Sequence, residues 1–157
     1  VCLDSNVFVA AFAARGLCAD LLALVISDYE LVVPQVVAEE VRRVLTTKLK
    51  VGAQTLLLLD AVLDRCEIIP RGLAASPIRL RDPSDELVLA GAILGRAEII
   101  VSGDDDLLSA ARESPIRILS PRAFMTLARG STLSPRYPPR PVLPLQTIGA
   151  TVLGRSP

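Results

Sequence analysis

The stretch Asp82–Leu108, DPSDELVLAGAILGRAEIIVSGDDDLL, decides the fold because it carries the signals for a helix, a strand and a second helix in direct succession. Asp82 followed by proline is typical of a helix N-terminus, with the aspartate as N-cap and the proline at the first helical position. After Gly95, the apolar and β-branched run 98–101 is typical of a buried parallel strand. Three aspartates from Asp104 onward then begin another helix. The stretch therefore predicts one unit of an α/β fold.

Asp85 is the acid of this stretch that is hardest to explain as a surface residue. At 3.6 residues per turn it shares a helix face with the apolar residues Val88, Leu89 and Ala92, and we expect that face to pack inward. An isolated buried charge is very costly, so a carboxylate there must be paired, protonated or bound to a cation. The alternative is that Asp82 and Asp85 only cap the helix, whose positive end favours acids.

The rest of the chain alternates strands with helices. Strands are expected at 1–3, 31–33, 67–69, 98–101 and 116–119, and helices at 7–14, 17–28, 35–49, 55–65, 83–94, from 104 and at 122–128. This order predicts a three-layer α/β/α sandwich with a central, mostly parallel sheet. The domain is expected to comprise residues 1–129. Residues 130–157 contain six of the twelve prolines and no core-forming period, so we expect a proline-rich, disordered tail there.

Composition narrows the possible chemistry. A chain of 157 residues that is 51% hydrophobic is long enough for one domain with a real core. Basic and acidic residues both number 17, which argues against a broad basic surface for duplex DNA. Histidine is absent, which removes imidazole bases, Ser-His-Asp catalysis and the commonest zinc ligand. Carboxylates must therefore carry any acid–base or metal chemistry.

The cysteines and the hydropathy pattern bear on the compartment. Cys2, Cys18 and Cys66 form no close pair and no CxxC motif, so neither a zinc ribbon nor a redox motif is indicated. The sequence contains no run of about 18 apolar residues, so no membrane span is expected, and no signal peptide is recognisable. A reducing cytoplasmic location is the expectation.

Two further acids occur in places where sites form. Asp4 follows the first expected strand, and the alternative to a functional role is an ordinary helix N-cap. Ser5 and Asn6 could orient its carboxylate by hydrogen bonds, or could satisfy the free backbone groups at the start of the helix. Glu40 follows Val37 by three residues on the apolar stripe of its helix, so we expect it on a buried face. A bound cation and a buried salt bridge to an arginine both explain such a glutamate.

Together, these acids describe an all-oxygen site in a chain without histidine. The carboxyl ends of parallel strands line the ligand crevice of open sheets, and Asp4 and Asp104 both follow strands. Oxygen ligands of this kind suit Mg²⁺ or Mn²⁺, which bind phosphates. Such ions polarise a phosphodiester and activate water, with two ions about 3.5–4 Å apart where both bind.

These residues resemble the PIN domain family, and within it the VapC-like toxin ribonucleases of toxin–antitoxin pairs. The resemblance covers residues 1 to about 128. It rests on LDSNVFVAAF at the start, on the AEEVRRVL helix, on the stretch quoted first and on the closing IRILSPRAF.

The resemblance implies roles for individual residues. The catalytic and metal-binding acids would be Asp4, Glu40, Asp85 and Asp104, with Asp106 as an additional metal ligand. The supporting polar residues would be Asn6, Ser102 and Asp82. Candidates to hold a substrate backbone are Arg15, Arg42, Arg43 and Arg81. The chain departs from the family pattern at Asp105, where related chains often carry a basic residue, and in the proline-rich tail, which has no counterpart that we can place.

The resemblance thus predicts a metal-dependent endoribonuclease that hydrolyses RNA phosphodiester bonds as the toxin of a toxin–antitoxin pair. It implies an RNA substrate, a cognate antitoxin and a homodimer. The alternatives are a non-catalytic PIN-like scaffold that binds RNA or a partner protein, and a DNA nuclease with the same site. Two other α/β classes are disfavoured. A haloacid-dehalogenase-like phosphatase needs a second aspartate at the position of Asn6. The phospho-acceptor aspartate and signalling lysine of a response-regulator receiver have no clear match in this sequence.

Overall fold

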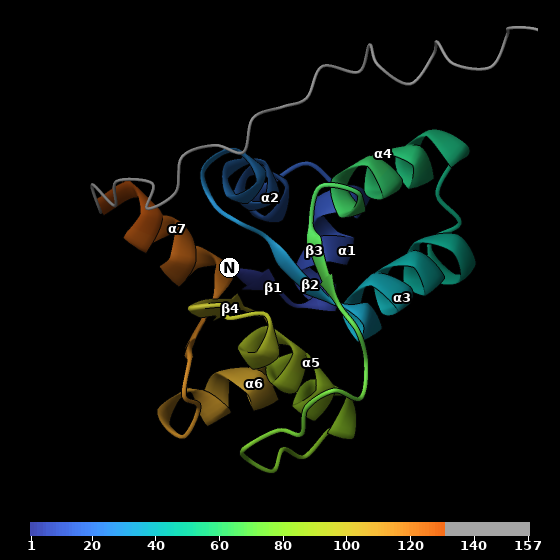
Figure 1. Ribbon diagram of the computed structural model, residues 1–157. Coiled ribbons are helices and arrows are strands. Elements are labelled where there is room, and N and C mark those ends of the chain that lie inside the picture. The colour runs from blue at the N-terminus through green and yellow to red at the C-terminus, as the bar shows by residue number, and fades with distance from the viewer. Residues whose placement is uncertain (131–157) are drawn as a thin grey trace, which may run out of the picture.

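The computed structural model describes residues 1–130, which are organised around a sheet of five short strands (Figure 1). The strands are β1 (Cys2–Leu3), β2 (Val32–Pro34), β3 (Glu67–Ile69), β4 (Ile99–Val101) and β5 (Arg117–Leu119). Their order across the sheet is β3-β2-β1-β4-β5, and every neighbouring pair is parallel. The predicted α/β fold with a parallel sheet is confirmed. The expected tail, 130–157, lies outside the described residues except for Gly130.

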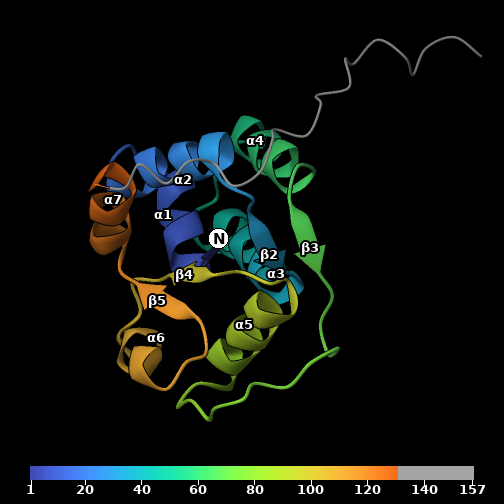
Figure 2. The ribbon, with the colours of Figure 1, turned by 60° about the vertical axis from the view of Figure 1, so that its left-hand side comes forward.

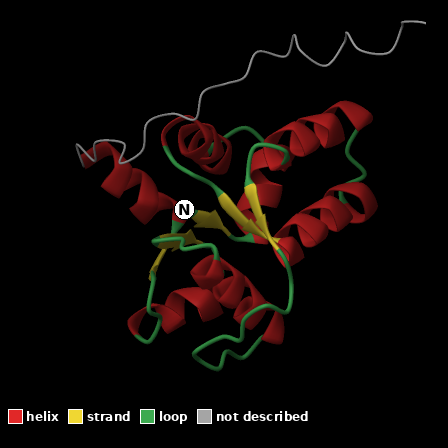
Figure 3. Cartoon of the chain, in the orientation of Figure 1, coloured by secondary structure: helices red, strands yellow, loops and turns green. Residues whose placement is uncertain are grey.

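Helices cover both faces of the sheet. They are α1 (Ser5–Ala13), α2 (Leu17–Asp28), α3 (Gln35–Arg43), α4 (Ala53–Leu63), α5 (Pro83–Leu94), α6 (Asp105–Ser109) and α7 (Pro121–Gly130). Figures 1 and 2 show α5 and α6 on one face and α1, α2 and α7 on the other, and Figure 3 shows the strands enclosed between these helical layers. Within residues 1–130 no single helix is long and apolar enough to cross a membrane, although the bent pair α1 and α2, at 108°, meets the criteria of length and composition together.

The two helical layers create two cores, and successive strand residues alternate between them. Cys2 and Ile100 pack with Leu89 of α5 in one core. Leu3 and Val101 pack in the other core, with residues of α1, α2 and α7. Because both faces of the inner strands are buried, these strands are continuously apolar in the sequence.

The strand order of the sheet reverses beside β1. The chain runs from β1 to β2 and β3 on one side, and then crosses to β4 and β5 on the other side. Ligands of open α/β sheets bind at the carboxyl ends of the strands where the order reverses in this way. Asp4 directly follows β1, and Ser102 directly follows β4. Both residues therefore flank this switch point.

One expected helix, 35–49, changes its geometry partway along. The α-helix ends at Arg43, and residues Val44–Lys48 form a π-helix. The hydroxyl groups of Thr46 and Thr47 donate to the carbonyl oxygens of Arg42 and Arg43, both at 2.6 Å. Such bonds compete with the regular α-helical ladder. The helix is predicted from the spacing of its apolar residues, and that spacing carries no signal for the change.

Glycines let α5 approach the sheet closely. A Cβ at Gly91 would lie 2.7 Å from the Cβ of Pro34, and one at Gly95 would overlap Val32 and lie 2.9 Å from Cγ1 of Ile69. Real Cβ atoms essentially never approach other heavy atoms so closely. The absence of side chains at these two positions therefore sets the distance between α5 and strands β2 and β3.

Gly95→Ala is expected to lower the free energy of unfolding by about 1–3 kcal/mol, because the added methyl group overpacks the interface between α5 and the sheet. Urea unfolding followed by circular dichroism measures the loss. Gly130→Ala is the control, since a Cβ there meets no atom of the described residues within 4 Å. Equal stability of the two variants would contradict the close packing described here.

Candidate metal centre

Asp4 is a buried acid with both carboxylate oxygens hydrogen-bonded. Its Oδ1 accepts from the backbone N–H of Ser5 at 2.7 Å, and its Oδ2 accepts from the hydroxyl of Ser102 at 2.9 Å. The residue is 3% exposed, and this burial raises the pKa of the carboxyl above its ordinary value, with the charges of Asp104 and Glu40 adding to the effect. The two hydrogen bonds act in the opposite direction because they favour the ionised form. Asp4 is therefore fixed in orientation.

Ser102 connects Asp4 to the second acid that follows a strand, Asp104. The Ser102 hydroxyl accepts from the backbone N–H of Asp104 at 2.9 Å while it donates to Asp4. Asp104 is the N-cap of α6, and its Oδ1 accepts from the backbone N–H of Asp106 at 2.8 Å. The cap leaves Oδ2 of Asp104 without a hydrogen bond from the residues described. One serine hydroxyl thus couples the ends of β1 and β4.

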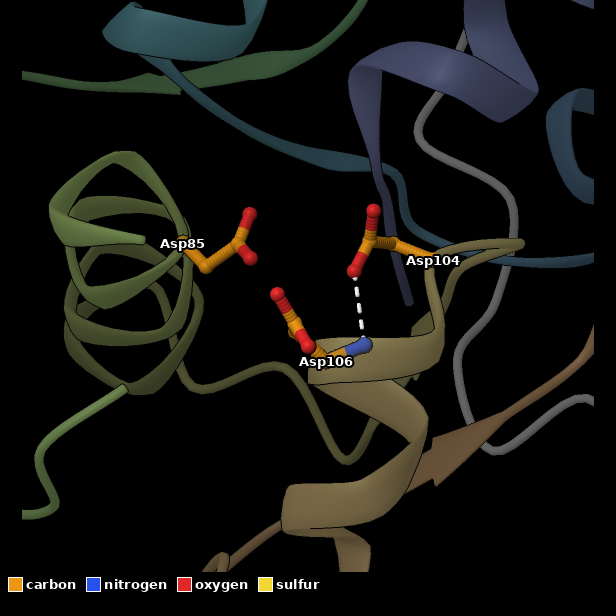
Figure 4. Close-up of side chains that lie close together, drawn as sticks. All are labelled: Asp85, Asp104 and Asp106. Carbon is orange, nitrogen blue, oxygen red and sulfur yellow. Dashed lines mark hydrogen bonds between the residues drawn. The ribbon is translucent and has the colours of Figure 1, made fainter. Parts of the chain in front are cut away.

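Asp104, Asp106 and Asp85 bring their carboxylates together between α6 and α5. One oxygen of each lies within 4.8 Å of those of the other two, and Figure 4 shows the three side chains pointing toward one another. Asp85 comes from the first turn of α5, whose N-cap is Asp82, as the sequence predicts. The three residues are partly buried, so the cluster is accessible from solvent.

The electrostatic environment of Asp85 is unusual for an aspartate. Burial raises its pKa to about 7, and the charges of Asp104, Asp4, Asp82 and Asp106 add to the rise in that order. Like charges at close range disfavour the ionised form. Ionisation of all of these carboxylates at once is therefore unfavourable unless a cation is bound.

Glu40 reaches the same region, but its predicted burial is wrong. Its side chain is 43% exposed and pairs with Arg43, Nη2 to Oε1, at 3.2 Å. Adjacent helix residues differ by about 100°, so Glu40 lies on the flank of the stripe centred on buried Val41 rather than beneath it. Its Oε2 accepts from the hydroxyl of Ser5 at 3.0 Å, which places Glu40 one serine away from Asp4.

The supporting residues divide into two groups. Ser102 contacts Asp4 as expected, and Asp82 caps α5 by accepting from the backbone N–H of Ser84 at 2.8 Å. Asn6 is exposed and makes no side-chain hydrogen bond within residues 1–130, so the expectation that it orients Asp4 is wrong. Ser5 performs that task through its backbone N–H and also contacts Glu40. The sequence predicted the role of Ser5 toward Asp4 but gave no signal for its contact with Glu40.

The four candidate substrate-binding arginines also differ in their surroundings. Arg81 lies 3.1 Å from the cluster, Nε to Oδ2 of Asp106, and Arg43 pairs with Glu40. Arg42 pairs instead with Asp60 on α4. Arg15 is exposed in the turn between α1 and α2 and has no ion pair within the described part of the chain. The structure therefore brings two of the four, Arg43 and Arg81, to the acids.

The donor set fits a hard divalent cation. All of the converging groups are carboxylates, which are preferred ligands of Mg²⁺ and Mn²⁺. Burial and the neighbouring carboxylates raise the pKa of Asp85 to about 7, and the positive group beside the cluster, Arg81, pairs with Asp106. Asp85, Asp104 and Asp106 could hold such an ion together, with Asp4 oriented beside them.

The pKa of Asp85 predicts how the stability of the metal-free protein depends on pH. The ordinary value is 3.8 and the folded value is about 7, so the protonated folded form stabilises the protein fully below about pH 4. That contribution is lost as the pH rises through 7. We therefore expect the Tm in EDTA to fall as the pH is raised from about 5 to about 8.

Asp85→Asn cannot ionise, so its Tm should fall less over the same range. Thermal unfolding followed by circular dichroism compares the two proteins, and addition of Mn²⁺ should raise the native Tm most at the alkaline end. An identical pH dependence in both proteins would contradict the raised pKa of Asp85.

Comparisons with known proteins define the class of this chain. The family model of the PIN domain matches residues 1–106. A solved structure, that of VapBC2 from Rickettsia felis bound to a DNA fragment from their promoter, is similar in fold, with a TM-score of 0.54 and 20% identity. The match covers 75% of this chain and 95% of the chain in that structure. No curated protein sequence matched.

The chain belongs to the PIN domain family. The family model spans both β1 and β4, and therefore Asp4, Asp85 and Asp104. Proteins with this domain are generally nucleases, and the acidic cluster described above lies in the matched region. The resemblance stated from the sequence motifs is thus confirmed for the family and for the fold.

Proposed function

We propose that this protein is a metal-dependent endoribonuclease that hydrolyses phosphodiester bonds of RNA. The observation that carries the proposal is the convergence of acids from four separate elements at the switch point of the sheet, in a PIN domain without histidine. Asp4, Glu40, Asp85 and Asp104 are the catalytic acids in this proposal, with Asp106 as a further metal ligand. The ion is Mg²⁺ or Mn²⁺.

The chain's own residues would prepare the site in distinct ways. Asp4 offers a carboxylate whose orientation is set by two hydrogen bonds. Asp104 keeps Oδ2 without a hydrogen bond from the described residues, because the cap of α6 uses its Oδ1. A bound divalent ion would supply the Lewis acid that polarises a phosphodiester and activates water. No protein nucleophile is needed, which agrees with the absence of histidine and the burial of Cys2.

The partners follow from the resemblance to VapC-like toxins. We propose that the protein is the toxin of a toxin–antitoxin pair, forms a homodimer, is bound by a cognate antitoxin and acts in the cytoplasm, where its three free cysteines stay reduced. The similar fold of VapBC2 supports this proposal. Among the arginines, Arg43 and Arg81 are best placed to meet the RNA backbone, because they lie beside the acids, whereas Arg42 is paired elsewhere.

Cleavage of RNA tests whether the clustered acids form a catalytic metal centre. A mixed pool of labelled RNA should be cut by the native protein with Mn²⁺ or Mg²⁺ and remain intact with EDTA. Asp104→Asn should lower the rate by about 100-fold or more, since even residues that only support metal ligands cost 10–100-fold when changed. Gel analysis of the RNA measures the rate.

The matched control is Asp105→Asn, which removes the same charge from the neighbouring position. Asp105 is exposed and is not part of the cluster, so cleavage should persist. Equal loss in both variants would point to a general charge effect. Cleavage of single-stranded DNA in preference to RNA would favour the DNA nuclease, and absence of both cleavage and Mn²⁺ binding would favour the non-catalytic scaffold.

A second prediction concerns the boundary of the catalytic unit. We propose that residues 1–130 contain everything that cleavage requires, because the proposed catalytic acids and the hydrogen bonds described for them lie there. Removal of residues 131–157 should therefore leave the rate of RNA cleavage unchanged in the same gel assay. Loss of cleavage by a folded truncated protein would assign part of the function to those residues.

A further inference from the structure

Arg81 is the positive group that the chain itself brings to the three-aspartate cluster. Its Nε lies 3.1 Å from Oδ2 of Asp106, whose carboxylate is grouped with those of Asp85 and Asp104. Within residues 1–130, neither Asp85 nor Asp104 makes a salt bridge. The guanidinium therefore compensates one member of a group of like charges.

The contact between Arg81 and Asp106 is easily exchanged. The Arg81 side chain is 87% exposed, and such exposed ion pairs contribute little to stability. The backbone is better fixed than the side chain, because Arg81 directly precedes Asp82, the N-cap of α5. The guanidinium can therefore leave Asp106 without any change in the helix.

We propose that Arg81 is an exchangeable counter-ion of the metal centre, which pairs with Asp106 in the metal-free protein and turns to a phosphate of the RNA once a divalent ion is bound. The inference rests on the proposed function and adds an order of binding to it. Two positive groups compete for the same carboxylates, so the ion displaces the guanidinium. A freed guanidinium suits a phosphate, because its planar fork matches two oxygens at once.

The same loop provides a matched comparison at Arg79. Its side chain is 96% exposed, and its Nη1 lies 3.7 Å from Oε2 of Glu86, an acid that is not in the cluster. Arg79 carries the same charge two residues earlier in the chain. Any effect of Arg81 that arises from the general charge of the loop should therefore appear at Arg79 as well.

Titration calorimetry with Mn²⁺ tests the first half of the proposal. Arg81→Gln should bind Mn²⁺ about tenfold more tightly than the native protein, because a competing and repelling charge is removed. Arg79→Gln and Arg81→Lys should stay within about twofold of the native affinity, since the first leaves the contact intact and the second keeps the charge.

Three results would overturn the inference. Unchanged affinity in Arg81→Gln would show that no competition exists, and weaker affinity would make Arg81 a group that orients Asp106 for the metal. An equal gain in Arg79→Gln would reduce the effect to overall charge. If the native protein binds no Mn²⁺, the proposed function fails together with the inference, which distinguishes that outcome from the other three.

Binding of RNA tests the second half. Fluorescence anisotropy follows a labelled 12-nucleotide single-stranded RNA with Ca²⁺ and with EDTA, and a gel checks afterwards that the RNA is whole. Arg81→Gln should weaken binding with Ca²⁺ and reduce the salt dependence by about 0.7 in log–log slope, the value for one lost phosphate contact. In EDTA the two proteins should bind alike. An equal difference in both conditions, or none in either, would refute the transfer.

Discussion

The hydrogen bond from the Ser102 hydroxyl to the buried carboxylate of Asp4 is the interaction on which the rest of the site depends. It joins the residue after β1 to the residue after β4, at the point where the strand order of the sheet reverses. The same hydroxyl accepts from the backbone of Asp104, so one group sets the positions of two acids. The parallel sheet brings the strand ends together, and this serine determines how their side chains meet.

The acids are joined through serine hydroxyls and backbone groups, and within residues 1–130 their ion pairs are those of Glu40 and Asp106. Ser5 donates hydrogen bonds to both Asp4 and Glu40. Asp104 accepts a hydrogen bond from the backbone N–H of Asp106. Arg43 pairs with Glu40, and Arg81 with Asp106. Asp85 lies against Asp104 and Asp106, and its burial together with the charges of these neighbours raises its pKa to about 7. A divalent cation bound by these three carboxylates would offset the repulsion between them.

The sequence predicted the parts of this arrangement that local rules govern. Asp4, Asp82 and Asp104 are all N-caps, and the signal for a cap lies within a few residues. Contacts between distant residues carry no such signal. The bond from Ser5 to Glu40 spans 35 residues, and the pairing of Arg81 with Asp106 depends on how a loop meets α6. Periodicity placed Glu40 near the apolar stripe but could not tell its flank from its centre.

The close packing of the C-terminal half of α5 against the sheet has a consequence for the acid at the N-terminal end of this helix. Gly95 and Gly91 let the helix rest against β2 and β3 with no space for a side chain between them. A helix seated so tightly has a single register along the strands. Asp85 lies ten residues before Gly95, about 15 Å away along the helix axis, so this register also fixes its position. The close packing at the two glycines therefore helps to set the distance between Asp85 and the other carboxylates.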